Sequence, residues 1–375
     1  MSTIIRTRSP YFIRTPEETD ATLSYFVIRI TIREGLINAG VPCSIPDVVF
    51  ILNKKPIGSE NSVSFDISEI VNDSLVQTYS SVPVGTYQSL WVDVQTSAST
   101  SAGAPIGSVT TTTYLAQEGF NKFKEGVNYT VQKSAMLTEN YLEYHTGSYI
   151  YLPINAELVS SVKWKNNNVA LQTTTITDNG NSNQKIQYTF FDIASLREAV
   201  DEVEVVTDSG TITIKLKEIE ECKYPVHKIT FLNRWGAFQD LFFFKKSTES
   251  LNTTSENYNA SIFKAKEIVK VLDGGNCVTS TVFNSYSTTA HSKKTYNANG
   301  VESIVLNSGY VSELNNSYFE ELMVSEYVWL TDSNNVIYPV NLKESSFNKK
   351  TGLNDGLINY TMSFEKSFSI VNNIR

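Results

Sequence analysis

Alternation of apolar and polar residues runs through most of the chain and predicts β-strands. The clearest case is residues 23–33, where four apolar residues (Phe26, Ile28, Ile30 and Ile32) occupy every second position. Successive side chains of a strand point to opposite faces, so this pattern predicts one buried and one more polar face. Short segments of the same kind follow at 48–52, 63–67, 87–95, 109–116, 129–133, 149–154, 162–165, 169–176, 186–190, 203–206, 212–216, 301–306, 326–330, 336–342 and 358–364.

Two segments follow the period of a helix instead. Residues 68–75 predict a short helix with Ser68 as its N-cap. Residues 311–324 predict the main helix, because their apolar residues recur at helical spacing and Ser312 can cap the first turn. The fold class expected is therefore mainly β, with two sandwich-like units followed by a small α+β unit.

The segment 224–246 holds the densest aromatic cluster of the chain. Two β-patterned halves flank Asn233-Arg234-Trp235-Gly236, a turn in which the glycine can adopt positive φ. The pattern predicts a central β-hairpin, with Trp235 and Phe238 anchoring its turn. Two interpretations remain open. The aromatic residues form a core, or Arg234 and Trp235 sit at an exposed tip and contact a partner.

Four parts are expected along the chain. Residues 1–20 carry Pro10 and Pro16 and lack alternation, which predicts an assembly arm outside any core. Residues 21–148 form the first β-sandwich, and its Ser/Thr-rich segment 96–107 is expected to be a mobile loop. Residues 149–250 form the second β domain with the central hairpin. Residues 251–375 form the α+β domain, after a polar linker at 247–259.

Composition narrows the possible functions. The net charge of −8 argues against a nucleic-acid partner, which requires a basic face. Three cysteines without a CxxC pair do not suggest zinc or a disulfide framework. No signal peptide is visible, and no apolar stretch reaches the roughly 18–20 residues of a membrane span. P-loop, GxGxxG and HExxH motifs are absent from the sequence, so neither a cofactor nor an enzymatic activity is expected.

Several motifs together resemble one family. They are Ser9-Pro10-Tyr11-Phe12, Phe65-Asp66-Ile67-Ser68, Phe231-Leu232-Asn233-Arg234-Trp235-Gly236 and the closing segment Leu357-Ile358-Asn359-Tyr360-Thr361-Met362-Ser363-Phe364. In this order they resemble structural proteins of tailed bacteriophages that infect Bacteroidota, including flavobacteria. The motifs are structural rather than catalytic. The resemblance implies a place in the virion, in the tail or baseplate.

The expected function is a non-enzymatic tail-tip or baseplate component, made in the bacterial cytoplasm. It would assemble into a homo-oligomeric ring and contact other tail proteins. The candidate interface residues are Tyr11, Phe12, Arg234, Trp235, Ile374 and Arg375. The alternative is an adhesin that binds host-surface glycans, with Trp164 and Trp235 as candidate sugar platforms.

Overall fold

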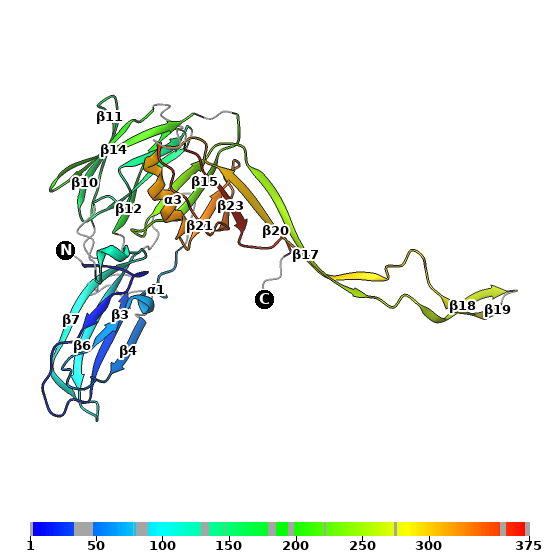
Figure 1. Ribbon diagram of the computed structural model, residues 1–375, viewed down its shortest axis with the longest axis horizontal. Coiled ribbons are helices and arrows are strands. Elements are labelled where there is room, and N and C mark those ends of the chain that lie inside the picture. The colour runs from blue at the N-terminus through cyan, green and yellow to red at the C-terminus, as the bar shows by residue number, and fades with distance from the viewer. Residues whose placement is uncertain are drawn as a thin grey trace.

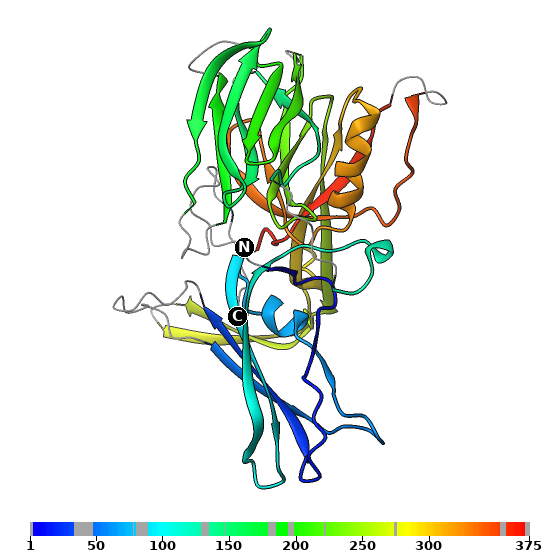
Figure 2. The same cartoon turned by 90° about the vertical axis from the view of Figure 1, so that its left-hand side faces the viewer.

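The chain folds into an N-terminal domain, a larger body and a long projecting arm (Figure 1). The computed structural model describes residues 3–33, 48–77, 79, 89–128, 135–146, 148–178, 185–193, 199–220, 223–273, 276–352 and 358–371. The fold is mainly β, as the alternation predicted. Figure 2 shows the N-terminal domain below the body, with the two in contact.

The N-terminal domain is built on a five-stranded sheet with the order β1-β7-β6-β3-β4. Its strands are β1 (Thr3–Arg6), β3 (Tyr25–Arg33), β4 (Val48–Lys54), β6 (Ser89–Ser99) and β7 (Pro105–Gln117). A second pair, β2 (Phe12–Arg14) with β5 (Ser64–Asp66), leads into the short helix α1 (Ser68–Asn72). The alternating apolar residues of β3 are buried in the core, as predicted.

The prediction that residues 1–20 lie outside any core is wrong. Strand β1 pairs in parallel with β7, and Ile5 is completely buried. Strand β2 pairs with β5, which buries Ile13. These strands are too short to show alternation, and their pairing depends on backbone hydrogen bonds that any sequence can make.

The Ser/Thr-rich segment 96–107 is also different from its prediction. It forms the distal end of the β6–β7 hairpin, where Thr96 lies opposite Thr110 and Ser99 opposite Pro105. Threonine favours strands, and the strand can carry these polar residues because β7 is largely exposed at this end of the hairpin.

The first part of the body is a sandwich of two sheets. The larger has the order β11-β10-β13-β14-β8, and the smaller pairs β9 with β12. The strands are β8 (Tyr141–His145), β9 (Tyr149–Asn155), β10 (Val159–Asn166), β11 (Val169–Thr175), β12 (Ile186–Asp192), β13 (Glu202–Thr207) and β14 (Gly210–Ile219). Trp164 of β10 packs against Phe191 of β12, with ring centroids 5.8 Å apart.

The second part of the body is a seven-stranded sheet with the order β16-β15-β21-β22-β23-β20-β17. The strands are β15 (His227–Leu232), β16 (Phe238–Phe243), β17 (Thr248–Asn259), β20 (Lys293–Asn307), β21 (Val328–Thr331), β22 (Ile337–Leu342) and β23 (Thr361–Lys366). The predicted main helix is present as the turn η2 (Glu313–Asn315) and the helix α3 (Asn316–Met323). Its apolar face packs on this sheet through Phe319 and Leu322.

The expected boundary at residue 250 does not separate two domains. It falls inside β17, and the central hairpin β15–β16 pairs with β21 of the C-terminal part. One hydrophobic cluster also contains residues from both parts of the body, from Ala135 to Phe364. The central hairpin therefore belongs to the C-terminal sheet, and the two parts of the body share one core.

The arm is a two-stranded ribbon that leaves the body at β17 and β20. These strands are paired from Thr248–Val305 out to Asn259–Lys293. Beyond them, β18 (Lys264–Asp273) pairs with β19 (Asn276–Ser285) at the far end. Figure 1 shows the ribbon extending well clear of the body. The segment 247–259 is thus a strand and not the predicted linker.

Candidate functional site

The candidate interface residues of the N-terminus lie in and beside the core of their own domain. Tyr11 is buried and meets Tyr114 edge to face, with centroids 5.6 Å apart. Phe12 is partly exposed, and its backbone N–H donates to Asn128 Oδ1 over 2.7 Å. Ile374 and Arg375 lie outside the described residues.

The central turn lies against the N-terminal domain. The backbone N–H of Phe120 donates to the carbonyl of Arg234 over 3.0 Å. The guanidinium of Arg6, from β1, donates to the carbonyl of Trp235. The hairpin of the body is therefore bonded through its turn to two segments of the N-terminal domain.

Arg234 completes this junction with its side chain. Its Nη2 donates to both carboxylate oxygens of Glu125, over 2.7 and 2.9 Å, and the pair is mostly buried. Glu125 closes the short 3-10 helix η1 (Phe123–Glu125). The guanidinium of Arg234 also lies 5.4 Å from the ring centroid of Trp235. Both bonds come from one nitrogen, and a mostly buried, charge-assisted pair of this kind holds Arg234 against η1.

Two glycines allow the backbones to meet. Gly236 has a φ of +79°, and a Cβ at this position would lie 1.8 Å from the carbonyl oxygen of Glu118. A Cβ at Gly119 would lie 2.4 Å from the carbonyl oxygen of Arg234. Any side chain at either position would separate the body from the N-terminal domain.

Charged groups are buried around this junction. Burial lowers the pKa of Arg6 to about 9, with the nearby Arg234 charge acting in the same direction. Burial raises the pKa of Glu118 to about 7 and that of Glu321, on α3, also to about 7. The carboxylate of Glu321 accepts the backbone N–H of Arg234 over 3.3 Å. Arg234 and Trp235 therefore serve contacts inside the chain.

Trp164 cannot be the sugar platform that the adhesin alternative requires. Its side chain is fully buried between the two sheets of the sandwich. Trp235 is partly buried and packs against a small cluster of Leu137, Ile186 and Ala237. A platform for a sugar needs an exposed ring face, and Trp164 does not offer one.

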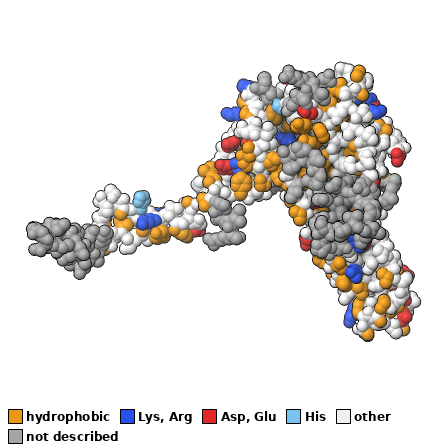
Figure 3. Space-filling model, turned by 180° about the vertical axis from the view of Figure 1, so that it is seen from behind, with side chains coloured by type: hydrophobic (Ala, Val, Ile, Leu, Met, Phe, Trp, Pro, Cys, Tyr) orange, Lys and Arg blue, Asp and Glu red, His pale blue; other side chains and the backbone are white. Residues whose placement is uncertain are grey.

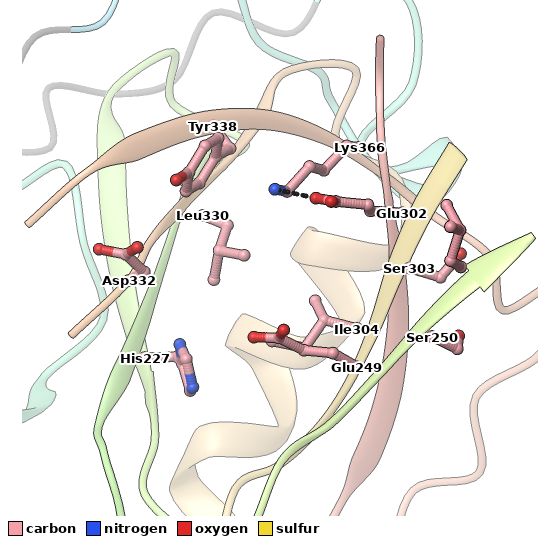
Figure 4. A pocket seen from close by; sticks show the side chains of 11 residues that line it. His227, Glu249, Ser250, Glu302, Ser303, Ile304, Leu330, Asp332, Tyr338 and Lys366 are labelled. Carbon is pink, nitrogen blue, oxygen red and sulfur yellow. Dashed lines mark hydrogen bonds and ion pairs between the residues drawn. The ribbon is translucent and has the colours of Figure 1, made fainter. Parts of the chain in front are cut away.

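A pocket of about 520 Å³ lies at the root of the arm (Figure 4). It is formed where β15, β17, β20, β21, β22 and β23 of the seven-stranded sheet come together. Its lining includes His227, Glu249, Glu302, Leu330, Asp332, Tyr338 and Lys366. His227 and Asp332 lie at one end, and the ion pair of Lys366 with Glu302 lies at the other.

His227 is the most unusual group in this pocket. Only 5% of the residue is exposed, and its Nδ1 has no hydrogen-bond partner among the described residues. Burial lowers its pKa, against the opposing effect of the Glu249 and Asp332 carboxylates. The imidazole is therefore neutral at neutral pH and can accept a hydrogen bond.

The arm presents an exposed and partly apolar surface (Figure 3). All twelve residues of β17 are exposed. Large apolar side chains along the ribbon are about half exposed or more, namely Leu251, Tyr258, Phe263, Tyr286 and Tyr296. Tyr258 and Tyr296 face each other across it, with centroids 6.0 Å apart. Such a surface is typical of a contact with another macromolecule.

Sequence reasoning missed both the pocket and the arm. The arm had one usable signal, because Asp273-Gly274-Gly275-Asn276 between two apolar-rich segments is a hairpin sequence. The pocket had none, since its residues come from segments as far apart as His227 and Lys366.

Within the described ranges, no group of three or more His, Cys, Asp or Glu residues is placed to hold a metal ion. No helix in the same part of the chain is both long and apolar enough to cross a membrane.

Comparisons with known proteins give little further information. No family model matches the chain, and no curated protein matches it. Among solved structures, the chain is similar to one described under host-cell-surface retention of a 1.5-MDa bacterial ice-binding adhesin. The match has 12% identity and covers 82% of this chain and 88% of that one, with a TM-score of 0.18. A TM-score this low supports no inference about fold or function.

Proposed function

We propose that this chain is a structural subunit of a tailed-phage virion, located in the tail tip or baseplate, with the arm as its main contact to neighbouring subunits. The observation that carries the proposal is the ribbon of β17 to β20. A two-stranded ribbon is marginally stable alone in water. All residues of β17 are exposed, and Figure 1 shows the ribbon projecting away from the body. A neighbouring subunit is the natural source of the missing contacts.

The rigid junction between the N-terminal domain and the body also supports a role as an assembly subunit. The N-terminal domain is fixed to the body by the Arg234–Glu125 pair and by close backbone contact at Gly119 and Gly236. An assembly subunit must hold its contact surfaces at constant relative positions. Both the arm and the N-terminal domain are attached to one continuous body core.

The test uses particles produced from a phage genome that encodes this chain. We expect gold-labelled antibody against the N-terminal domain to mark one end of the tail. In a genome lacking the gene, the parent chain supplied in trans should restore assembly. The double variant Tyr258→Ser/Tyr296→Ser should fold normally but fail to restore it. The control is Phe123→Ser, which removes a fully exposed aromatic ring away from the arm.

Two results would contradict the proposal. One is the absence of the chain from purified particles. The other is normal assembly with the double arm variant, provided that its melting temperature equals that of the parent chain.

A further inference from the structure

A buried lysine of the body lies beside two carboxylates, at the border with the N-terminal domain. Lys185 directly precedes β12 and is completely buried. Its Nζ lies 2.6 Å from Oδ1 of Asp178 and 3.4 Å from Oε1 of Glu157. The same nitrogen lies 6.0 Å from the ring centroid of Trp91, a buried residue of β6. An amine and two carboxylates are therefore held together where the amine has almost no contact with solvent.

Hydrogen bonds fix the relative positions of these three groups. The carbonyl of Lys185 accepts the backbone N–H of Ala156 over 2.9 Å, and Glu157 is the next residue. The side-chain amide of Gln187, on β12, donates to the carbonyl of Thr177 over 3.1 Å, and the second carboxylate belongs to the residue that follows. Both carboxylates therefore stand on segments that are bonded to β12 or to the lysine just before it.

Burial favours transient neutralisation of the Lys185–Asp178 pair. A buried ammonium group loses its hydration, which costs free energy that its attraction to a carboxylate repays only in part. Transfer of one proton along the 2.6 Å contact, from Nζ to the carboxylate, removes both charges. The products are a neutral amine and a carboxylic acid in contact, which are a nucleophile and its electrophile. Proximity fixed by the fold accelerates a reaction between two such groups by many orders of magnitude.

We propose that Lys185 and Asp178 form an isopeptide bond between Nζ and Cγ. The lone pair of Nζ attacks Cγ of the protonated Asp178 carboxyl, and the Nζ–Cγ bond forms. The Glu157 carboxylate, 3.4 Å from Nζ, accepts a proton from this nitrogen and passes it to the departing hydroxyl group. One Cγ–O bond breaks, one water leaves and Glu157 is again a carboxylate. The reaction needs no oxidant, reductant or other reactant.

The bond would close a covalent ring over residues 178–185. It would join the segment after β11 to the start of β12 and replace a buried charged pair by a neutral amide. The inference does not depend on the proposed virion role.

Mass spectrometry of the full chain tests the bond without any variant. The intact mass of the folded chain is expected to be lower than its sequence mass by one water. Trypsin does not cut after an acylated lysine, so the digest should contain the uncut peptide 166–197, one water lighter. Its fragment ions should join Lys185 to Asp178. A backbone succinimide at Asp178 would also lose one water, but it would leave Lys185 open to trypsin.

Two variants test the roles of the amine and of the second carboxylate. Lys185→Met removes the amine and keeps a side chain of similar length, so its mass should equal that of its own sequence. Glu157→Gln keeps the shape but cannot accept the proton. In freshly synthesised protein followed over time, its bond should form at least about a hundredfold more slowly than in the parent chain.

The exposed pair of Lys349 with Glu320 is the internal control. Its atoms are also 2.6 Å apart, but the two side chains are 55% and 44% exposed. Water stabilises both charges there, so this pair should remain unlinked in the same digest.

Three results would overturn the proposal. One is a parent chain of unreduced mass whose Lys185 is cut by trypsin. The second is a loss of water located at another position. The third is equal linkage of the exposed Lys349 pair, which would remove the argument from burial. An unchanged rate in Glu157→Gln would overturn the role given to Glu157.

Discussion

Gly236→Ala tests whether the junction between the N-terminal domain and the body is a rigid contact. The alanine Cβ would lie 1.8 Å from the carbonyl oxygen of Glu118, where an ordinary contact requires more than 3 Å. The obstructing atom is backbone, so it cannot rotate away. The turn and the end of β7 must therefore separate by more than about 1 Å, since both are close-packed.

The expected loss of unfolding free energy in Gly236→Ala has two parts. Alanine at a φ of +79° costs about 1–2 kcal/mol in backbone energy. Separation also stretches the Phe120–Arg234 backbone hydrogen bond and weakens the charged Arg234–Glu125 pair. A neutral hydrogen bond contributes about 1 kcal/mol net and a charged one about 1.5–3 kcal/mol. The expected loss of unfolding free energy is therefore about 4 kcal/mol or more.

Gly58→Ala is the matched control. Gly58 also has positive φ, +64°, but its Cβ would meet no atom within 4 Å. This variant carries the backbone cost alone, about 1–2 kcal/mol.

The assay is urea unfolding together with calorimetry. The parent chain is expected to show coupled unfolding of its parts, whereas Gly236→Ala should show a separate, earlier transition of the N-terminal domain. Equal loss of stability in the two glycine variants, with no change in the number of transitions, would refute the close-contact reasoning.

Other parts of the structure give further expected outcomes. Burial raises the pKa of Glu118, so its protonated form stabilises the fold at low pH, and this contribution is lost as pH rises towards about 7. Glu118→Gln should therefore stabilise the chain more at pH 8 than at pH 5 in thermal melting. Val311→Asp should cost several kcal/mol in urea unfolding, because it places an unpaired charge at a buried site. Deletion of residues 1–20 should lower the melting temperature, since it removes β1 and β2 from the N-terminal domain. Trp235→Ala should lower the melting temperature of the isolated subunit, which an indole used only between subunits would not do.

The sequence alone determined where most of the ordinary strands and the main helix lie. Within the predicted range 23–33, Tyr25–Arg33 forms a half-buried strand, because alternate apolar side chains can be buried on one face only in that geometry. The helix α3 lies within the predicted range because its apolar residues share one face only at helical spacing. The central hairpin likewise forms around the turn that Gly236 permits. In each case the information is local, because burial of one face imposes a period on the chain.

The tertiary structure decided what these elements pair with and where the site residues lie. The strand β17 is exposed along its whole length, so burial imposed no hydrophobic period and the segment resembled a linker. The parallel pairing of β1 with β7 joins residues more than a hundred positions apart through backbone groups that are the same in every sequence. The junction at Arg234 and the pocket at His227 arise from such long-range placements. Their residues are adjacent only because the completed core fixes the sheet edges on which they stand.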